Sequence, residues 1–244
     1  MPALSAPEIK QARIDLAAAL RWAVRHGLNE GICNHFSMDV GEGRFLVNPL
    51  GWHWSEVSAS SLLMADFDGN VLEGDGEVEP TAFYIHSRIH KNCPQARVVL
   101  HTHMPYATAL TMCEGGRLEP CEQKAIRLSQ DIAYDDDYSG LALDNAEGDR
   151  MAAKLGNKRI LFLASHGIIV THDTVAEAYD DLYYLERACQ VQVIARQSGL
   201  PLRRLSDEIV EETRQQSGDS RFSAPLHFAS LKRLLDREEP DYAD

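Results

Sequence analysis

The sequence predicts an α/β protein in which helices pack on a mixed or antiparallel sheet. Short alternating or apolar runs follow one another between residues 36 and 72, and glycine-containing turns separate them, as in β-hairpins. Segments with apolar residues every three or four positions flank these runs, which is typical of amphipathic helices. Because no repeat or low-complexity linker interrupts residues 8–205, we expect one domain over residues 1–205 and a C-terminal extension over residues 206–244.

The elements of the first half follow from local signals. Apolar residues recur with helical spacing over residues 8–26, and Gly27 ends that helix. Pro80 begins a second helix that runs to residue 92, because proline suits the first turn of a helix. Between them we expect strands at residues 36–40, 44–47, 62–66 and 71–72.

The second half repeats the alternation of strand and helix. A strand begins at residue 98 and runs into His101 and His103, and further strands cover residues 159–164 and 168–171. Residues 145–155 are expected to be helical. Thr174 and Glu177 form a capping box that begins a long helix ending near Gly199. The polar tail carries one amphipathic helix around residues 226–235.

Composition narrows the class of protein. The 244 residues are 44% hydrophobic and 25% charged, as in an ordinary globular protein. A net charge of −13 argues against nucleic acid as a partner, since binding the phosphate backbone needs a basic face. A membrane partner is not expected either, because no stretch approaches the roughly 20 apolar residues that span a bilayer. The N-terminus lacks a signal-peptide pattern, and five cysteines without a CxxC pair favour reduced thiols and a cytoplasmic location.

The strongest chemical signal is the pair His101 and His103. Alternate residues of a strand point to the same face, so the two imidazoles can converge on one point. Imidazole is a common ligand of zinc, iron and similar ions. Two unrelated histidines that happen to alternate would give the same pattern. His166 follows an apolar strand and precedes Gly167, a place where loops gather around a pocket, although a strand-end histidine can also simply face solvent.

Six motifs follow one another along the chain: GICNHFS (31–37), NPLGWHW (48–54), MADFDG (64–69), the helix from Pro80 to His86, HTH (101–103) and SHG (165–167). In this order they resemble the class II aldolase/adducin family over roughly residues 8–200. The resemblance implies a three-layer α/β/α sandwich with a central, mainly antiparallel sheet. It implies one divalent metal per chain (zinc, manganese or iron) held by His101, His103 and His166. It also implies a cyclic homotetramer with active sites between subunits.

The chain departs from the sugar-phosphate aldolases of that family at the acid. Those enzymes carry Pro-Ser-Ser-Glu, whose glutamate moves the proton, whereas the corresponding place here is Ala82 or Phe83. Glu79 lies nearby, but the helix start would have to shift by about one turn for it to substitute. The phosphate-binding places read Asn34-His35 and Pro80-Thr81 or Thr81-Ala82, with fewer donors. We therefore do not expect a sugar phosphate as substrate.

Further candidates take their places from the resemblance. His35 occupies the place of a pocket-facing asparagine and is a candidate catalytic residue, and Glu122 lies near the offset of a tyrosine proton donor. Asn34, Phe83 and Tyr138 are candidate substrate-binding residues; Tyr138 belongs to an acidic stretch, residues 134–138, that either caps the pocket or is a solvated turn. His86 is expected to pack behind the site and His90 to be exposed.

Three functions remain open at this stage. The first is a metal-dependent lyase that cleaves a carbon–carbon bond of a small hydroxy or oxo acid, by decarboxylation or retro-aldol cleavage. Loss of the glutamate favours decarboxylation, which needs no base to begin. The second is a non-heme Fe(II) oxygenase, because a three-histidine site also holds Fe(II). The third is a non-enzymatic scaffold like the adducin head domain, although a scaffold has no need of three metal-binding histidines.

Overall fold

The computed structural model describes residues 1–217 and 222–244, and within them an eight-stranded sheet forms the centre. The strand order is β4-β3-β2-β1-β5-β8-β7-β6. Only β6 and β7 pair in parallel among these strands, because the helix α5 connects them as a crossover. The mostly antiparallel α/β sheet is therefore confirmed. The strands are β1 (His35–Gly41), β2 (Arg44–Val47), β3 (Leu63–Asp66), β4 (Val71–Glu73), β5 (Val98–Thr102), β6 (Ile132–Asp135), β7 (Ile160–Leu163) and β8 (Gly167–His172).

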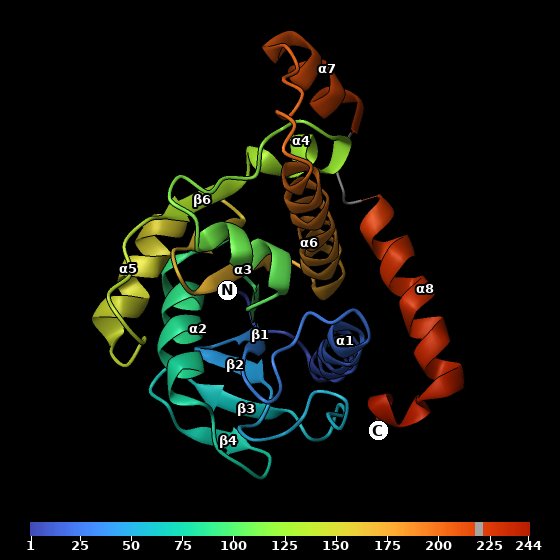
Figure 1. The fold of residues 1–244 in the computed structure, drawn as a ribbon. Helices are drawn as coiled ribbons and strands as arrows, with labels where there is room; N and C mark the ends of the chain where they lie inside the picture. Colours follow the sequence, from blue (N-terminus) through green and yellow to red (C-terminus); the bar gives the residue numbers. More distant parts are fainter. Residues whose placement is uncertain (218–221) are drawn as a thin grey trace.

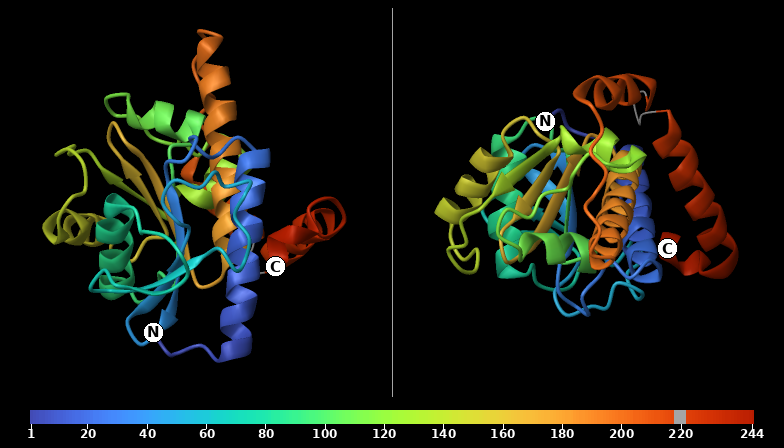
Figure 2. Two further views of the ribbon diagram at one scale, coloured as in Figure 1. Left: turned by 90° about the horizontal axis from the view of Figure 1, so that it is seen from below. Right: turned by 45° about the horizontal axis from the view of Figure 1, so that its top comes forward.

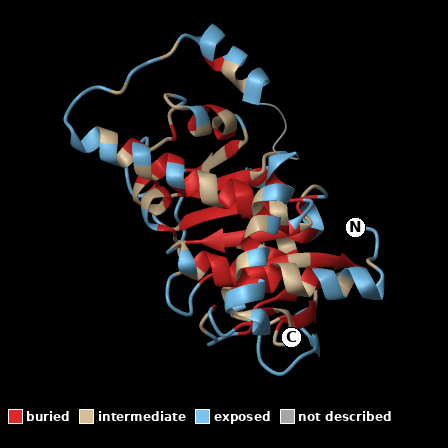
Figure 3. Ribbon diagram, turned by 90° about the vertical axis from the view of Figure 1, so that its right-hand side faces the viewer, coloured by how far each residue is buried: buried red, intermediate tan, exposed pale blue. Residues whose placement is uncertain are grey.

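Helices cover both faces of the sheet (Figures 1 and 2). The helices α2 (Pro80–Asn92) and α5 (Asn145–Leu155) lie on one face, and α1 (Ala6–Arg25) and α6 (Val175–Gln197) lie on the other. Alternation along β5 supplies both cores, since Leu100 packs toward α1 and α6 while Val99 packs toward α2 and α5. The central strands are buried and the outward helix faces are exposed (Figure 3).

The C-terminal residues add a further layer outside α1 and α6 (Figure 2). The expected helix around residues 226–235 is α8 (Ser223–Glu238), and two elements that we did not expect, α7 (Asp207–Ser217) and the 3₁₀-helix at Pro240–Ala243, flank it. Phe228 and Leu231 of α8 join the main core, and the Trp22 indole N–H donates to the Leu231 carbonyl at 3.0 Å. None of the described helices combines the length and the apolar composition that crossing a membrane requires.

Three short elements between β5 and α5 were also not expected: α3 (Pro105–Thr111), α4 (Gln123–Ser129) and β6. The acidic stretch 134–138 is therefore only partly a loop, since Tyr134 and Asp135 belong to β6. Asp135 is fully buried and forms ion pairs with Arg150 and Lys154 of α5. A buried carboxylate needs such partners, and these lie on a helix that the local sequence of β6 does not reveal.

Candidate metal centre

The register of β1 against β5 builds the floor of the site. His35 lies directly opposite His101 in this antiparallel pair, and their rings stack with centroids 4.9 Å apart. Residues two apart on a strand share a face, so Ser37 also points toward α2. Phe36, between them, packs into the opposite core. One face of these two strands is therefore polar beneath α2.

Three histidines converge at the end of β5. His101 lies on β5, His103 just beyond it, and His166 in the turn between β7 and β8. One ligand nitrogen from each lies within 4.8 Å of the other two, and the ring centroids are 4.8–5.0 Å apart. The three side chains that the family resemblance implied as metal ligands therefore lie together.

The turn that carries His166 depends on its neighbours. Ser165 has a left-handed backbone with φ of 55°. Any side chain at Gly167 would place its Cβ 2.6 Å from the Thr102 carbonyl and 2.7 Å from the His103 ring. Only glycine permits this approach of β8 to β5, which brings His166 beside His103.

The Nδ1 atoms of His101 and His103 already have hydrogen-bond partners. The Nδ1 atom of His101 lies 2.9 Å from the Ile168 carbonyl oxygen, so it carries the proton and leaves the lone pair on Nε2. The Nδ1 atom of His103 lies 2.6 Å from a Glu30 carboxylate oxygen. His103 Nε2 is buried and has no hydrogen-bond partner among the described residues. Such an arrangement fixes the tautomer in which Nε2 faces a metal.

Burial favours the neutral form of two of the clustered histidines, His101 and His166. Burial, followed by the neighbouring His103, lowers the pKa of His166 to about 4. Burial and the surrounding histidines lower the pKa of His101 well below its usual value. A divalent ion needs neutral imidazoles, so these donors fit a metal such as zinc, manganese or iron.

A second row of histidines lies beneath α2. His86 and His90 are one helical turn apart, and both reach the hydroxyl of Ser37, at 2.5 and 2.7 Å. The His86 Nε2 atom lies 2.7 Å from His35 Nδ1. His86 thus packs behind the site as expected. The expectation that His90 is exposed is wrong, because α2 turns this polar stripe toward β1 and leaves only 4% of His90 exposed.

Asn34 lies between β1 and the three histidines. Its left-handed backbone, with φ of 74°, lets its side-chain oxygen accept from the His103 backbone N–H at 3.2 Å. The amide Nδ2 is buried and unpartnered among the described residues. A buried amide donor without a partner is suited to a ligand. The substrate-binding role of Asn34 stays a prediction.

The N-terminus of α2 lies at the rim of the same site. The helix begins at Pro80 as expected, and the Glu79 carboxylate caps it by accepting from the Ala82 N–H at 2.7 Å. A Glu79 oxygen also lies 3.7 Å from His35 Nε2. Glu79 thus comes closer to the site than its sequence position suggested, without any shift of the helix start.

The remaining candidates lie elsewhere in the chain. The Phe83 ring packs over the turn at Gly69 and against Tyr84, and no contact in the described part of the chain joins it to the three histidines. The Glu122 carboxylate accepts from the N–H groups of Lys124 and Ala125 and so caps α4. These contacts give both residues structural roles within one chain.

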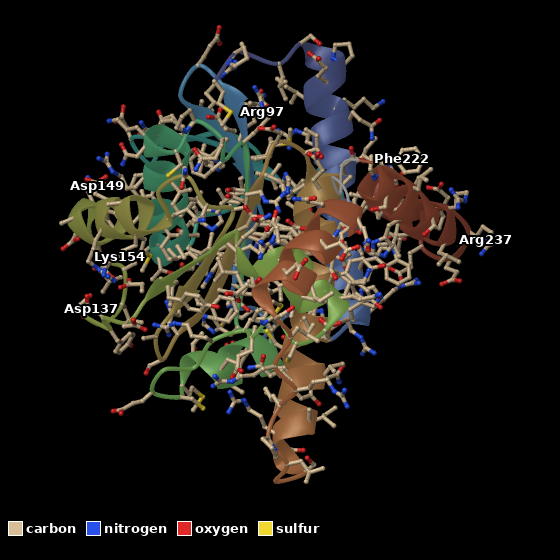
Figure 4. The ribbon with its side chains drawn as sticks, turned by 90° about the horizontal axis from the view of Figure 1, so that it is seen from above. Arg97, Asp137, Asp149, Lys154, Phe222 and Arg237 are labelled. Atoms are coloured by element: carbon tan, nitrogen blue, oxygen red, sulfur yellow. The ribbon has the colours of Figure 1, made fainter. Side chains whose placement is uncertain are left out.

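Tyr138 is 56% exposed in the loop after β6. An ion pair of 3.2 Å between Asp137 and Lys154 holds that loop on α5 (Figure 4).

Beside Ser165 a cavity of about 380 Å³ opens, which our sequence interpretation missed. Arg117, which stacks on Tyr134 with a 4.2 Å separation, borders it. The Gly115-Gly116 pair was the only local signal for a turn there.

Comparison with known proteins agrees with this geometry. A protein of Caulobacter vibrioides named "Putative aldolase class 2 protein" is 37% identical over 96% of this chain and 92% of its own length. The crystal structure of an aldolase II superfamily protein from Pseudomonas syringae superposes with a TM-score of 0.90 at 33% identity, covering 98% of each chain.

Two Streptomyces proteins are more distant relatives. One from Streptomyces niveus, named "Decarboxylase NovR", is 29% identical over 93% of this chain and 84% of its own length. Another from Streptomyces roseochromogenus, named "4-hydroxy-3-prenylphenylpyruvate oxygenase/4-hydroxy-3-prenylbenzoate synthase", is 29% identical over 90% of this chain and 82% of its own length. The family model described as "Class II Aldolase and Adducin N-terminal domain" matches residues 14–193. The chain therefore belongs to the class II aldolase and adducin family.

Proposed function

We propose that this protein is a metal-dependent lyase that cleaves a carbon–carbon bond of a small hydroxy or oxo acid. The observation that carries the proposal is the convergence of three histidines, two of which have Nδ1 hydrogen-bonded to an acceptor. A divalent ion held there would supply Lewis-acid stabilisation of the negative charge that develops as the bond breaks.

The residues around the three histidines favour decarboxylation over aldol cleavage. The places of the family's catalytic glutamate are occupied by Ala82, which is buried, and Phe83, which packs over Gly69. Decarboxylation begins with loss of carbon dioxide and requires no proton acceptor at that step. The Asn34 amide would orient a substrate oxygen beside His103. A relative is named a decarboxylase, which supports this choice.

A non-heme Fe(II) oxygenase is the second candidate. None of the three clustered ligands is a carboxylate, and another relative carries an oxygenase name. Three imidazoles leave positions for both a substrate and dioxygen on Fe(II). The two candidates differ in their metal and in oxygen consumption.

We also propose a homotetramer in which neighbouring subunits complete the sites. In this proposal the neighbouring subunit would contact the exposed Tyr138 and the N-terminus of α4, which Glu122 caps. Sedimentation equilibrium of the purified protein tests the tetramer, and a monomer at micromolar concentration would contradict it.

The function itself is tested by a substrate screen on protein purified without oxygen. Zinc- or manganese-loaded protein that releases carbon dioxide or an aldehyde from hydroxy or oxo acids without oxygen would support the lyase. Iron-loaded protein that consumes oxygen in step with the acid would replace it with the oxygenase. His103→Ala protein serves as the inactive control in both assays.

A further inference from the structure

We propose that a row of hydrogen bonds from the Ala96 carbonyl to His35 makes His35 Nε2 a fixed hydrogen-bond acceptor, which selects a substrate with a hydroxyl group. The residues between them, His90, Ser37 and His86, are positioning residues. The inference rests on the proposed function only for the class of ligand, because the direction of the row follows from the hydrogen bonds themselves.

The row has a defined direction because it starts at a carbonyl. The Nδ1 atom of His90 lies 2.8 Å from the Ala96 carbonyl oxygen, which can only accept. Nδ1 of His90 therefore carries the proton, and Nε2 of the neutral ring has a lone pair. That lone pair lies 2.7 Å from the Ser37 hydroxyl, so Ser37 donates to His90.

The remaining members follow in turn. A serine hydroxyl has one proton, so Ser37, which donates to His90, must accept from His86 Nδ1. The neutral His86 ring then has its lone pair on Nε2. Since this atom lies 2.7 Å from His35 Nδ1, His35 donates to it and keeps its own lone pair on Nε2.

No donor satisfies that last lone pair within the described residues. Thr81 Oγ1 is 3.4 Å from His35 Nε2, but its single proton goes to the Glu79 carboxylate, with which it makes a much shorter contact. Glu79 itself lies 3.7 Å from His35 Nε2 and also accepts. Two acceptors therefore face each other at the rim of the site, beside the ring of His101.

This arrangement limits what can bind there. A phosphate or carboxylate oxygen would face both a lone pair and a carboxylate, and would have no proton to offer. A hydroxyl can donate its proton to His35 Nε2 or to the Glu79 carboxylate. A polar site built for a hydroxyl rejects the analogue without it, since the acceptors are then left unpaired.

The tautomer is tested first, on the full chain dialysed against a chelator. Long-range ¹H–¹⁵N correlation spectra of ¹⁵N-histidine-labelled protein distinguish the protonated from the unprotonated ring nitrogens. Loss of one ring signal in His35→Gln assigns His35. We expect Nδ1–H tautomers for His35, His86 and His90. A His35 ring protonated on Nε2, or on both nitrogens, would overturn the proposal. This measurement does not depend on enzymatic activity.

Ser37→Ala interrupts the row, and Ser87→Ala is its matched control. Ser87 is equally buried, also lies beside His86, and its hydroxyl is unpartnered among the described residues. We expect His35 to become a mixture of tautomers in Ser37→Ala and to be unchanged in Ser87→Ala. A single unchanged tautomer in both variants would contradict the role of the row.

Ligand selection is measured by titrating zinc-loaded protein with mandelate and phenylacetate, which differ by one hydroxyl. We expect wild type and Ser87→Ala to prefer mandelate by about tenfold, which corresponds to one hydrogen bond of about 1.4 kcal/mol. Ser37→Ala should lose most of that preference. Equal binding of the two acids by wild type, or an unchanged preference in Ser37→Ala, would overturn the selection. Absence of lyase activity with an intact preference would contradict the proposed function alone.

Discussion

Two groups of histidines meet at the stacked rings of His35 and His101, and they use their nitrogens differently. In the group at the end of β5, the Nδ1 atoms of His101 and His103 bind a carbonyl or a carboxylate, and His103 Nε2 has no hydrogen-bond partner among the described residues. In the row beneath α2, His86 and His90 use both nitrogens within the protein. The hydrogen-bond partners of a histidine, more than its burial, therefore decide whether its nitrogen is available to a metal.

The largest expected effect is that of His103→Ala. The change removes one of the three candidate metal ligands. Loss of a residue that only hydrogen-bonds a ligand lowers metal affinity about 10- to 100-fold, so loss of the ligand itself should lower it further. Activity should fall with it. Metal content after gel filtration measures the effect, and His53→Ala, at a surface histidine bonded to Ser55, is the control. Full metal retention in His103→Ala would show that the histidines at the end of β5 are no more available to a metal than those beneath α2.

Glu30→Ala tests whether the hydrogen bond between the Glu30 carboxylate and His103 Nδ1 orients the His103 ring. The variant removes the carboxylate 2.6 Å from His103 Nδ1, and we expect metal affinity to fall about 10- to 100-fold. Glu42→Ala, which removes an exposed carboxylate paired with Arg44, should leave the affinity unchanged. Equal affinities in the two variants would show that the Glu30 contact does not orient His103.

Burial of His90 in the row beneath α2 should make the free energy of unfolding depend on pH. Burial lowers the pKa of His90 to about 4, whereas in the unfolded chain it has its ordinary pKa of about 6.5. The unfolded chain thus binds more protons below pH 6.5, and stability falls as pH decreases toward 4. Between pH 7.5 and 5 the contribution of His90 is about 2 kcal/mol.

The measurement is chemical unfolding of wild type and His90→Gln at both pH values, after removal of metal. Glutamine does not titrate, so the variant should lose less stability than wild type on acidification. An identical loss in both proteins would mean that His90 is not buried as a neutral ring.

Glu79→Gln should have the smallest effect. Glutamine keeps an oxygen that can cap α2, so stability should change by less than about 1 kcal/mol. We expect the catalytic rate to change by less than about tenfold, because decarboxylation needs no carboxylate base at this position. A loss of several orders of magnitude in rate would instead identify Glu79 as the displaced acid of an aldolase.

Strand alternation made the convergence of His101 and His103 predictable from local sequence, whereas the grouping of His166 with them came from the family resemblance. The burial of His90 was not predictable, because helical spacing shows that His86 and His90 share a face but not which layer that face meets. Glu30 was also missed, since 73 residues separate it from His103 and only the fold brings them together. The C-terminal packing is similar: Arg21 pairs with Glu239 and Asp241, more than 200 positions away. Contacts of this range follow from topology and not from any local pattern.

Elemental analysis can show whether His101, His103 and His166 hold a divalent metal. The protein would be purified without oxygen and without a metal-chelating column, beside His103→Ala prepared in the same way. We expect about one zinc, manganese or iron per chain in wild type, and far less in the variant. Wild-type protein that neither contains metal nor takes it up on dialysis against zinc, manganese and Fe(II) would contradict this expectation.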